Sequence, residues 1–328
     1  MQMSDARGTS TVTVLGEALI DLIADPASVE GPVRYSAQVG GSPYNVAIGL
    51  ARLEQPTQLM ARLSTDAFGR QLRERLAGNG VLLDAAVIAT ERTTLAVASL
   101  DAEGRAFYDF YIENTADWQW STEELAAFPP ASAVLHTGSL ASWLAPGSDR
   151  IAALTQRLRD AGTVLISYDP NIRPDLFSDR DSARERVERS VRAAHLTKAS
   201  TEDLEWLYPD SGTDEIAQAW LQLGCELVVV TRGADGMSAY SDALGRRDHA
   251  GKTVAVVDTI GAGDSCMAAL LDGLVRRDAA VPGGPGALTA EVVDGLLDDA
   301  ALIAAITCSR AGANPPTRAE VAAIRADQ

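Results

Sequence analysis

The sequence predicts an α/β fold in which a mostly parallel sheet is covered by helices on both faces. Between residues 131 and 233, short apolar runs alternate with amphipathic helical patterns. This alternation is typical of parallel strands joined by crossover helices, because such strands are buried on both sides and read as apolar runs. The chain has 328 residues, of which 46% are apolar, so it can build a large core.

The N-terminal part of the chain is predicted to mix strands and helices. Apolar runs bounded by glycine or polar residues indicate strands, and apolar residues recurring every three to four positions indicate helices. In chain order we expect a strand at 11–16, a short exposed strand at 31–39, a helix from Asn45, a helix at 66–78, and two strands within 94–112 around a turn at Asp101–Gly104.

The rest of the chain is more regular. Its apolar runs and helical patterns alternate until a hairpin interrupts them, and two long helices close the sequence. In chain order we expect strands at 132–138, 163–170, 195–200 and 227–233, with helices near 148–161, 180–193 and 213–223 between them, then a hairpin at 236–250, a strand at 253–257, and helices at 263–276 and 289–310.

Charge and composition exclude several classes of partner. The formal net charge is −17, which repels nucleic acid and anionic membrane surfaces, so neither is expected to bind. The first ten residues are polar and no apolar run has the length of a membrane span, which predicts a cytoplasmic protein. Cys225, Cys266 and Cys308 fit neither a disulfide framework nor a zinc pattern. An anionic ligand can bind only where local donors and cations overcome the overall field.

Polar residues follow five predicted strands. In sheets of this kind, ligands bind at the carboxyl ends of the strands, so these residues are expected to share one cleft. In chain order they are Glu17 and Asp21; Asp169, Asn171 and Arg173; Lys198, Ser200 and Asp203; Arg232 and Gly233; and Asp258 to Asp264.

The sequence GAGD at 261–264 is a candidate phosphate site. It lies between a predicted strand and a helix, and its glycines allow several backbone N–H groups to face one concavity. The helix start adds a partial positive charge of about half a unit. Asp264 is also an ordinary acid for a first helical turn, but the neighbouring Asp258 and Thr259 favour function. A similar tripeptide, GKT at 251–253, is rejected as a P-loop because residue 246 is arginine and a strand follows.

Two further motifs have both a structural and a functional interpretation. GGSPYN at 40–45 is either a turn with a helix cap, or a close backbone approach to a ligand hydroxyl that the Asn45 amide also contacts. DPNIRP at 169–174 is held extended by its prolines. Its Arg173 either binds phosphate or forms an ion pair with Asp169.

These motifs together resemble the ribokinase-like (PfkB) carbohydrate kinases. DTIGAGD at 258–264 resembles the C-terminal signature of that family, and GGSPYNVAIGLARL at 40–53 resembles its N-terminal signature. The resemblance extends over residues 11–323. It implies a three-layer αβα core with a central mostly parallel sheet and a small β-sheet lid, the core formed by residues 11–25, 39–92 and 113–328, and the lid by residues 26–38 and 93–112.

The resemblance also implies an ATP-dependent sugar kinase and assigns roles to residues. Asp264 matches the general base, while Gly261, Ala262 and Gly263 match the anion hole and Arg173 a catalytic position near the phosphates. Sugar contacts are implied for Asp21, Gly40, Gly41, Asn45 and Phe110, together with Asp264. Nucleotide contacts are implied for Lys198, Ser200, Thr231, Gly233, Gly236, Gly261, Gly263 and Asn314.

Metal sites are implied as well, with one departure from the family pattern. Asp258 and the backbone of Ile260 match a monovalent-cation site, for which potassium is expected. The family often has Asn-x-x-Glu near the phosphates, whereas this chain has Ser200 and Asp203 in those places. Asp203 keeps the carboxylate, so magnesium is expected there through water.

The segments SPYNVAIGLARL, TADWQW and TKASTEDLEWLYP look most like bacterial fructokinases. The expected reaction is therefore phosphorylation of D-fructose to fructose 6-phosphate, with 2-keto-3-deoxygluconate and ribose as alternative substrates. A different class stays open, namely a catalytically weak sugar-binding regulator on the same fold. Lid aromatics such as Phe110 either shield a neutral sugar or serve ordinary packing. A homodimer through the lids is a further expectation from the resemblance.

Overall fold

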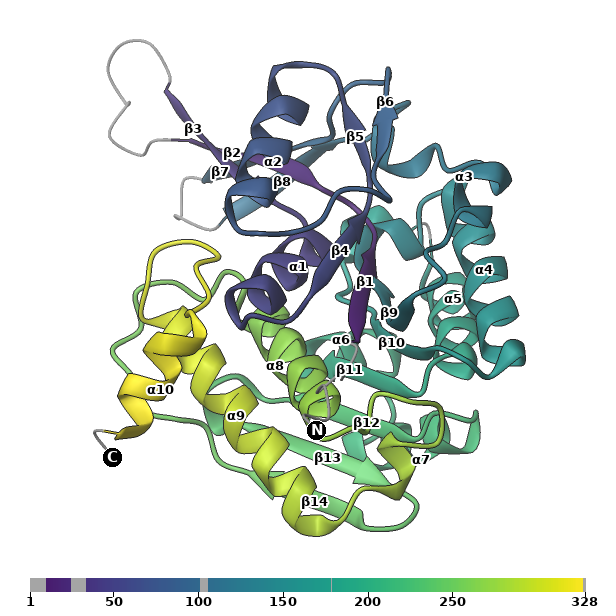
Figure 1. Cartoon of the computed structure of the whole chain (residues 1–328), viewed down its shortest axis with the longest axis vertical. Helices are drawn as coiled ribbons and strands as arrows, with labels where there is room; N and C mark the ends of the chain where they lie inside the picture. Colours follow the sequence, from purple (N-terminus) through teal and green to yellow (C-terminus); the bar gives the residue numbers. More distant parts are fainter. Residues whose placement is uncertain (1–9, 25–33, 101–105, 178, 327–328) are drawn as a thin grey trace, which may run out of the picture.

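The computed structural model describes residues 10–24, 34–100, 106–177 and 179–326. Within these ranges the main sheet has eight strands in the order β14-β13-β12-β11-β10-β9-β1-β4 (Figure 1). The strands from β12 to β4 are parallel, β13 pairs antiparallel with β12, and β14 pairs antiparallel with β13. Their bounds are β1 Thr11–Leu15, β4 Thr57–Met60, β9 Ser132–Gly138, β10 Leu165–Asp169, β11 Leu196–Ser200, β12 Leu227–Thr231, β13 Met237–Ser241 and β14 Gly245–His249.

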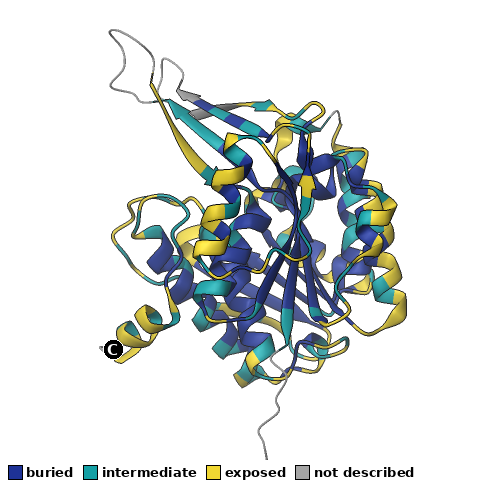
Figure 2. Ribbon diagram, turned by 45° about the horizontal axis from the view of Figure 1, so that its top comes forward, coloured by how far each residue is buried: buried dark blue, intermediate teal, exposed yellow. Residues whose placement is uncertain are grey.

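Helices cover both faces of the main sheet, which confirms the predicted three layers. Neighbouring strand residues point to opposite faces, so Val134 packs into one apolar cluster and Leu135 into the other. The cluster with Val134 includes α1 Ser42–Arg52, α2 Ala67–Gly78, α8 Ala262–Arg276 and α9 Ala290–Cys308. The cluster with Leu135 includes α3 Thr122–Ala126, α4 Gly147–Ala161, α5 Arg180–Ala193, α6 Thr201–Leu207 and α7 Thr213–Gln222. The outer helix faces are exposed while the sheet is buried (Figure 2).

The remaining elements are short or peripheral. The C-terminal helix is α10 Arg318–Ala326, and a two-stranded parallel sheet joins β5 Arg62–Ser64 to β6 Val87–Ala89. Among the described residues, no helix combines the length and the apolar character needed to cross a membrane. Single 3₁₀ turns lie at η1 Ala116–Trp118, η2 Ser139–Ser142, η3 Pro174–Leu176, η4 Gly233–Asp235 and η5 Pro285–Ala287.

A separate small sheet lies above one edge of the core, as the lid prediction requires. Its order is β3-β2-β7-β8, formed by β2 Leu19–Ala24, β3 Tyr35–Gly40, β7 Leu95–Leu100 and β8 Ala106–Tyr111. The antiparallel pair β7–β8 confirms the two strands expected within 94–112. The predicted turn at Asp101–Gly104 and the lid residues 26–33 lie outside the described residues.

The predicted boundary between core and lid was wrong at its first segment. We placed residues 11–25 in the core, but β2 pairs with β3 and β7 and so belongs to the small sheet. The chain leaves the main sheet after Leu15 and enters the small sheet at Leu19, within three residues. Both strands are apolar, so composition gave no sign of the change of sheet.

The strand predicted at 253–257 was also wrong. This segment has no regular structure, and the side chains of Val256 and Val257 are each 64% exposed. The main-chain N–H groups of Val257 and Asp258 donate to the carbonyl oxygen of Cys308 at the end of α9, over 2.8 and 3.2 Å. Since β14 already forms the edge of the main sheet, the segment caps a helix end instead of joining the sheet.

Two valines distinguish a buried strand from this exposed segment. We expect Val229→Ala, in the fully buried β12, to lower the free energy of unfolding by about 2–3 kcal/mol, because it leaves a cavity. The matched change Val257→Ala should alter it by less than about 0.5 kcal/mol. Urea unfolding measures both. Equal losses would show that residues 253–257 are buried like a core strand.

Candidate active site

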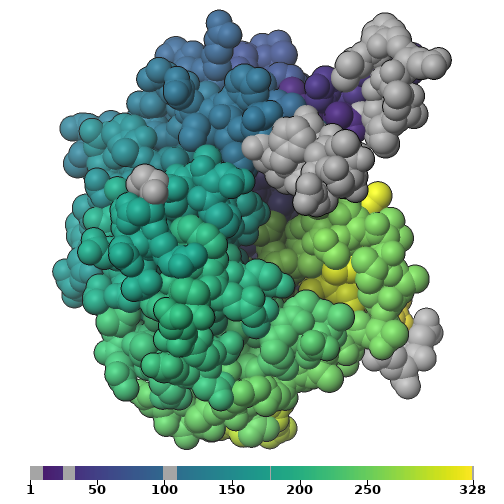
Figure 3. All heavy atoms as spheres, turned by 180° about the vertical axis from the view of Figure 1, so that it is seen from behind, coloured from purple at the N-terminus to yellow at the C-terminus, as the bar shows by residue number. Residues whose placement is uncertain are grey.

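A cleft of about 730 Å³ opens between the main sheet and the small sheet. Figure 3 shows the surface hollowed between the teal-blue and green parts of the chain. The cleft receives residues from the small sheet, the start of α1, the loop after β10 and two C-terminal loops. Of the predicted site residues it brings together Asp21, Gly40, Gly41, Asn45, Phe110, Arg173, Asp258, Ile260, Gly261, Gly263, Asp264 and Asn314.

Several predicted nucleotide and metal residues do not line this cleft. Most lie in β11 and β12 or just after them, so the five polar clusters meet in one cleft only in part. Glu17 and Asn171 do line it. The predicted residues outside its lining are Ala262, Lys198, Ser200, Asp203, Thr231, Gly233 and Gly236.

Asp264 is held by two donors from the start of α1. The Ser42 hydroxyl donates to Oδ1 over 2.6 Å, and the Asn45 amide donates to Oδ2 over 2.8 Å. Burial raises the pKa of the Asp264 carboxyl, and the bonds from Ser42 and Asn45 oppose that rise. Asp264 is therefore more than a common acidic residue in the first turn of a helix, because α1 and α8 meet at its carboxylate.

Close packing of α1 on α8 makes this meeting possible. A Cβ atom added to Gly49 would lie 2.8 Å from the Cβ of Ala268, so only glycine allows the two helices to approach this closely. Gly49 belongs to the segment after GGSPYN, which the sequence showed only as a helical pattern. The sequence from Ser42 to Gly49 thus fixes both the donors and their distance from α8.

The loop before α8 is shaped to hold an anion. Gly261 has φ +77°, and a Cβ there would lie 2.7 Å from Ala313, so a side chain is excluded for two reasons. The helix α8 begins at Ala262, and its first N–H groups have no partner within the helix. With the positive end of the helix dipole, these groups favour negative charge beside Asp264.

A buried ion pair lies behind this loop. The Lys198 ammonium contacts the Asp169 carboxylate over 2.8 Å, and both side chains are buried. Burial is the largest single effect and disfavours the charged lysine, but the charge and hydrogen bond of Asp169, together with the charges of Cys266 and Asp203, raise the pKa of Lys198 on balance. A Cβ on Gly263 would lie 3.5 Å from Lys198 Nζ, so the cation supports the loop from below.

The loop after β10 leaves Arg173 available to the cleft. Asp169 pairs with Lys198, which removes the alternative ion pair between Asp169 and Arg173. Among the described residues, Arg173 donates only to neutral oxygens of its own loop, on Asn171 and Ile172. Its charge acts on Asp21 and Asp264, lowering the pKa of each against the stronger effect of burial.

Comparison with known proteins decides the family. A model of the pfkB family of carbohydrate kinases matches residues 9–320. The chain belongs to this family. The fructokinase of Rhizobium leguminosarum bv. trifolii is 34% identical over 79% of this kinase and 78% of its own length.

Solved structures agree in fold over almost the whole kinase. The fructokinase of Xylella fastidiosa with bound ATP superposes with a TM-score of 0.87 at 27% identity, covering 98% of this chain and 99% of that one. A double mutant of the Vibrio cholerae O395 fructokinase, with fructose, ADP and a potassium ion bound, gives a TM-score of 0.82 at 26% identity, covering 96% and 98%. The ribokinase-like core predicted from the two signatures is therefore confirmed.

Both carboxylate oxygens of Asp203 accept hydrogen bonds from neighbouring groups of the kinase. Its Oδ2 accepts from the Ser200 N–H and hydroxyl over 2.9 and 2.8 Å, and its Oδ1 accepts from the Ile172 N–H over 2.7 Å. The carboxylate therefore caps α6 and also fixes the loop that carries Arg173. A direct metal bond would displace these donors, so the predicted water-mediated contact to magnesium is the arrangement that these bonds permit, and it stays a prediction.

Asp258 joins the two C-terminal loops of the cleft. Its Oδ1 accepts from the Ile260 N–H over 3.0 Å and its Oδ2 from the Gly312 N–H over 2.9 Å. In the part of the chain that the structure describes, no three His, Cys, Asp or Glu side chains gather in a metal-binding cluster. A cation at Asp258 would therefore depend on backbone carbonyls, which suits a weakly bound monovalent ion.

Sequence reasoning missed some residues of the cleft. Ser42 was quoted within GGSPYN, but its bond to Asp264 was not foreseen, although its place three residues before Asn45 puts both on one helix face. Ser139 follows β9 directly and accepts from the Asn171 amide over 3.3 Å. Gly312 and Ala313 lie in the segment AGANPPT at 311–317, in which a role was predicted for Asn314 alone, and Arg75 carried no motif. They reach the cleft through tertiary packing alone.

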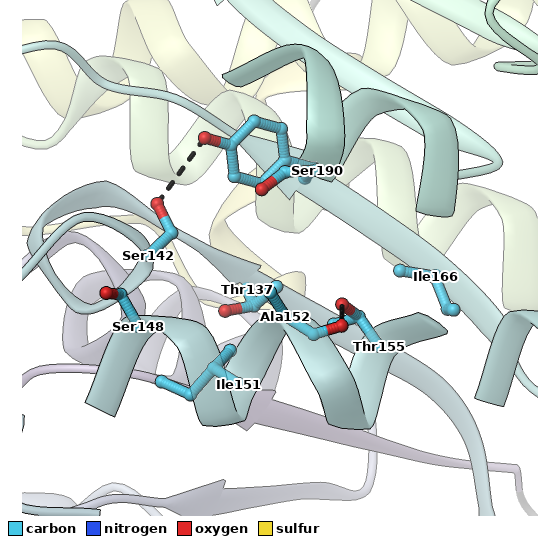
Figure 4. A pocket seen from close by; sticks show the side chains of 9 residues that line it. Thr137, Ser142, Ser148, Ile151, Ala152, Thr155, Ile166 and Ser190 are labelled. Carbon is cyan, nitrogen blue, oxygen red and sulfur yellow. Dashed lines mark hydrogen bonds between the residues drawn. The ribbon is translucent and has the colours of Figure 1, made fainter. Parts of the chain in front are cut away.

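A second, much smaller cavity is lined by hydroxyl groups beneath α4. Its volume is about 10 Å³, which is room for one water molecule and not for a sugar. Figure 4 shows Ser142 bonded to the Tyr168 hydroxyl, 3.4 Å away, while the hydroxyl of Thr137 has no partner in the described residues. The large cleft is therefore the candidate active site.

The bond from Ser42 gives a test of Asp264 by pH. Ser42→Ala removes a donor that stabilises the carboxylate, so the pKa of Asp264 should rise further above 3.8. The acidic limb of kcat/KM should move to higher pH by about one unit, which corresponds to a charged hydrogen bond. Ser265→Ala is the control, since the Ser265 hydroxyl donates to backbone oxygens only. An unmoved limb would mean that another group titrates.

Proposed function

We propose that this kinase transfers the γ-phosphate of ATP to the 6-hydroxyl of D-fructose. The observation that carries the proposal is the position of Asp264, which Ser42 and Asn45 hold in the cleft. The residues predicted to contact the sugar line one side of this cleft, and the 261–263 loop lines the other. Relatives named fructokinase, and a fructokinase structure with bound ATP, support the choice of substrates. 2-Keto-3-deoxygluconate and ribose stay the alternative acceptors.

The geometry supports a simple phosphoryl transfer. Asp264 accepts the proton of the sugar hydroxyl as its oxygen forms a bond to the γ-phosphorus, and the bond from that phosphorus to the bridging oxygen of ADP breaks. The N–H groups of Gly261 and Gly263, with Lys198 behind the loop, would stabilise the charge on the transferred group, whereas the N–H of Ala262 already donates to the Thr259 carbonyl oxygen. Arg173 adds a positive charge from the loop after β10. A raised pKa suits Asp264, since a stronger base accepts the proton more readily.

We further propose magnesium and potassium as ions of this reaction. Magnesium, carried with ATP, would neutralise phosphate charge, and Asp203 would reach it through water. Potassium would bind at the carboxylate of Asp258 and the carbonyl of Ile260. The potassium ion in the Vibrio cholerae O395 fructokinase variant supports this second ion.

The small sheet is proposed to act as a lid and as a dimer contact. It forms one wall of the cleft through Asp21, Gly40 and Phe110. Its edge strands expose Tyr35 and Tyr111, which are 48% and 61% accessible, and such rings favour contact with a second copy. A cytoplasmic location is proposed as well, and the free thiols of the three cysteines support it.

Replacing the proposed base should stop turnover without unfolding the protein. Asp264→Asn keeps the size of the side chain but removes the proton acceptor, so kcat should fall at least about 10³-fold. Circular dichroism and nucleotide binding, measured on the same samples, should remain close to the wild type. A variant with near-normal turnover would disprove the role of Asp264.

The choice of sugar is tested by a panel of acceptors. ADP release, measured by a coupled assay with magnesium, should give the highest kcat/KM for D-fructose, followed at a distance by ribose, 2-keto-3-deoxygluconate and fructose phosphate. Equal values would reject fructose as the preferred acceptor and leave the family assignment intact. Turnover with none of these sugars, together with measurable sugar binding, would favour a regulator.

A further inference from the structure

Two cleft residues at neighbouring strand ends have a backbone conformation that only glycine adopts freely. Ser139 follows β9 with φ +53°, and Asn171 comes two residues after β10 with φ +41°. Of the five described residues other than glycine with positive φ, these are the two that line the cleft. Such residues persist only where their surroundings hold them, and they cluster at functional sites. A role in the cleft would explain why both are retained.

Hydrogen bonds hold both backbones in place. The Asn171 N–H donates to Asp169 Oδ1 over 3.2 Å, and the Ser139 carbonyl oxygen accepts from the Ser142 hydroxyl over 2.7 Å. Because β9 and β10 are paired in the main sheet, the two loops leave it side by side. The side chains of Ser139 and Asn171 therefore meet from fixed positions.

The chemistry of arginine decides which way the Asn171 amide points. A guanidinium only donates, so the amide atom that Arg173 Nη1 contacts over 2.8 Å must be the oxygen. The amide nitrogen then faces Ser139 and donates to its hydroxyl oxygen over 3.3 Å. One amide thus connects Arg173 to a fixed residue of the neighbouring loop.

The amide holds one part of the guanidinium and leaves another part for a ligand. Besides the amide, Nη1 of Arg173 donates to the carbonyl oxygens of Asn171 and Ile172, over 3.3 and 2.9 Å. Its Nε and Nη2 atoms form no hydrogen bond within the described ranges. These two nitrogens form an edge that can donate to two oxygens of a phosphate at once. Without the amide, only main-chain oxygens would hold Arg173.

We propose that Asn171 is a positioning residue for the transfer reaction and acts by holding Arg173 at the cleft. Ser139 fixes the amide, and the amide fixes the guanidinium. This role rests on the proposed function, in which Arg173 supplies positive charge to the phosphate that is transferred. Asn171 acts through Arg173 and not on the reacting atoms.

The test removes the amide without changing the backbone. Glycine adopts the left-handed conformation freely, so Asn171→Gly should fold and melt close to the wild type. With ATP, magnesium and D-fructose, kcat should fall about tenfold, as expected for the loss of one hydrogen bond to a charged group. KM for the sugar should stay within about twofold, because the proposed sugar contacts are retained.

Asn114→Gly is the matched control. Asn114 has φ +54° and is exposed outside the cleft lining, so the same change is made to the same kind of backbone away from the site. Its kcat should equal that of the wild type. Unchanged kcat in Asn171→Gly, or an equal fall in Asn114→Gly, would overturn the proposal.

A double-mutant cycle shows whether Asn171 acts through Arg173. Arg173→Ala should lower kcat at least as much as Asn171→Gly does, and the variant with both changes should match Arg173→Ala alone. If the two losses multiply instead, Asn171 acts independently of Arg173 and the proposal fails. Ser139→Gly, which keeps the backbone and removes the hydroxyl, should lose less than Asn171→Gly and add nothing to it.

The carboxyl pKa of Asp21 gives a readout that needs no turnover. Burial raises this pKa to about 6, and the charge of Arg173 lowers it, so carbon-13 NMR of the kinase without ligands can follow where that charge lies. Arg173→Ala should raise the pKa, and Asn171→Gly should raise it part of the way, whereas Asn114→Gly should not. A pKa that moves in Arg173→Ala but not in Asn171→Gly would show that Asn171 does not position the guanidinium. No sugar or nucleotide is present, so this result stands even if the proposed reaction is wrong.

Discussion

The contact between helices α1 and α8 is the constraint on which the rest of the site depends. Both helices begin at the cleft, and Gly49 lets them pack closely enough for the start of one to meet the start of the other. Asp264 lies at that meeting point and takes one hydrogen bond from each of two α1 residues. The start of α1, where sugar contacts are proposed, and the 261–264 loop, where the phosphate is proposed to bind, are therefore held together by a helix pair. Rigid elements of this kind hold reacting groups in position with little entropy to lose.

The net charge of this protein is unfavourable for binding an anion, and local positive groups oppose it. A chain of net charge −17 must bind a nucleotide that is itself strongly negative. In the proposed site, glycine N–H groups, a helix start, Arg173 in the cleft lining and Lys198 behind it would oppose this charge. Lys198 is kept charged in a buried position by Asp169, so its charge supports the 261–264 loop without being free to leave it. Arg173 has no such carboxylate partner among the described residues and bonds only neutral oxygens of Asn171 and Ile172 there.

Much of the fold was readable from the sequence, and the failures have physical causes. The strand at 132–138 and the helix at 180–193 agree with the structure because their patterns reflect burial by immediate neighbours. The strand predicted at 253–257 failed because alternating apolar residues there meet a helix end and solvent, and a sequence pattern carries no information on which neighbour is present. Gly261, Asp264 and Asn45 were found through motifs. Arg75 could not be found, because only the packing of α2 brings it to the cleft.

Ser200 and Asp203, which depart from the family pattern, are also held in place by hydrogen bonds to neighbouring residues. A serine and an aspartate are each shorter than the asparagine and glutamate that the family often has, and in this chain they bond each other across the start of α6. The remaining oxygen of Asp203 takes the Ile172 N–H, which anchors the segment before Arg173. The shorter side chains extend less far than asparagine and glutamate would. They form a rigid connection between α6 and the β10 loop. Ile172, the neighbour of Arg173, is thus fixed by Asp203, while the Arg173 side chain meets no acidic side chain among the described residues.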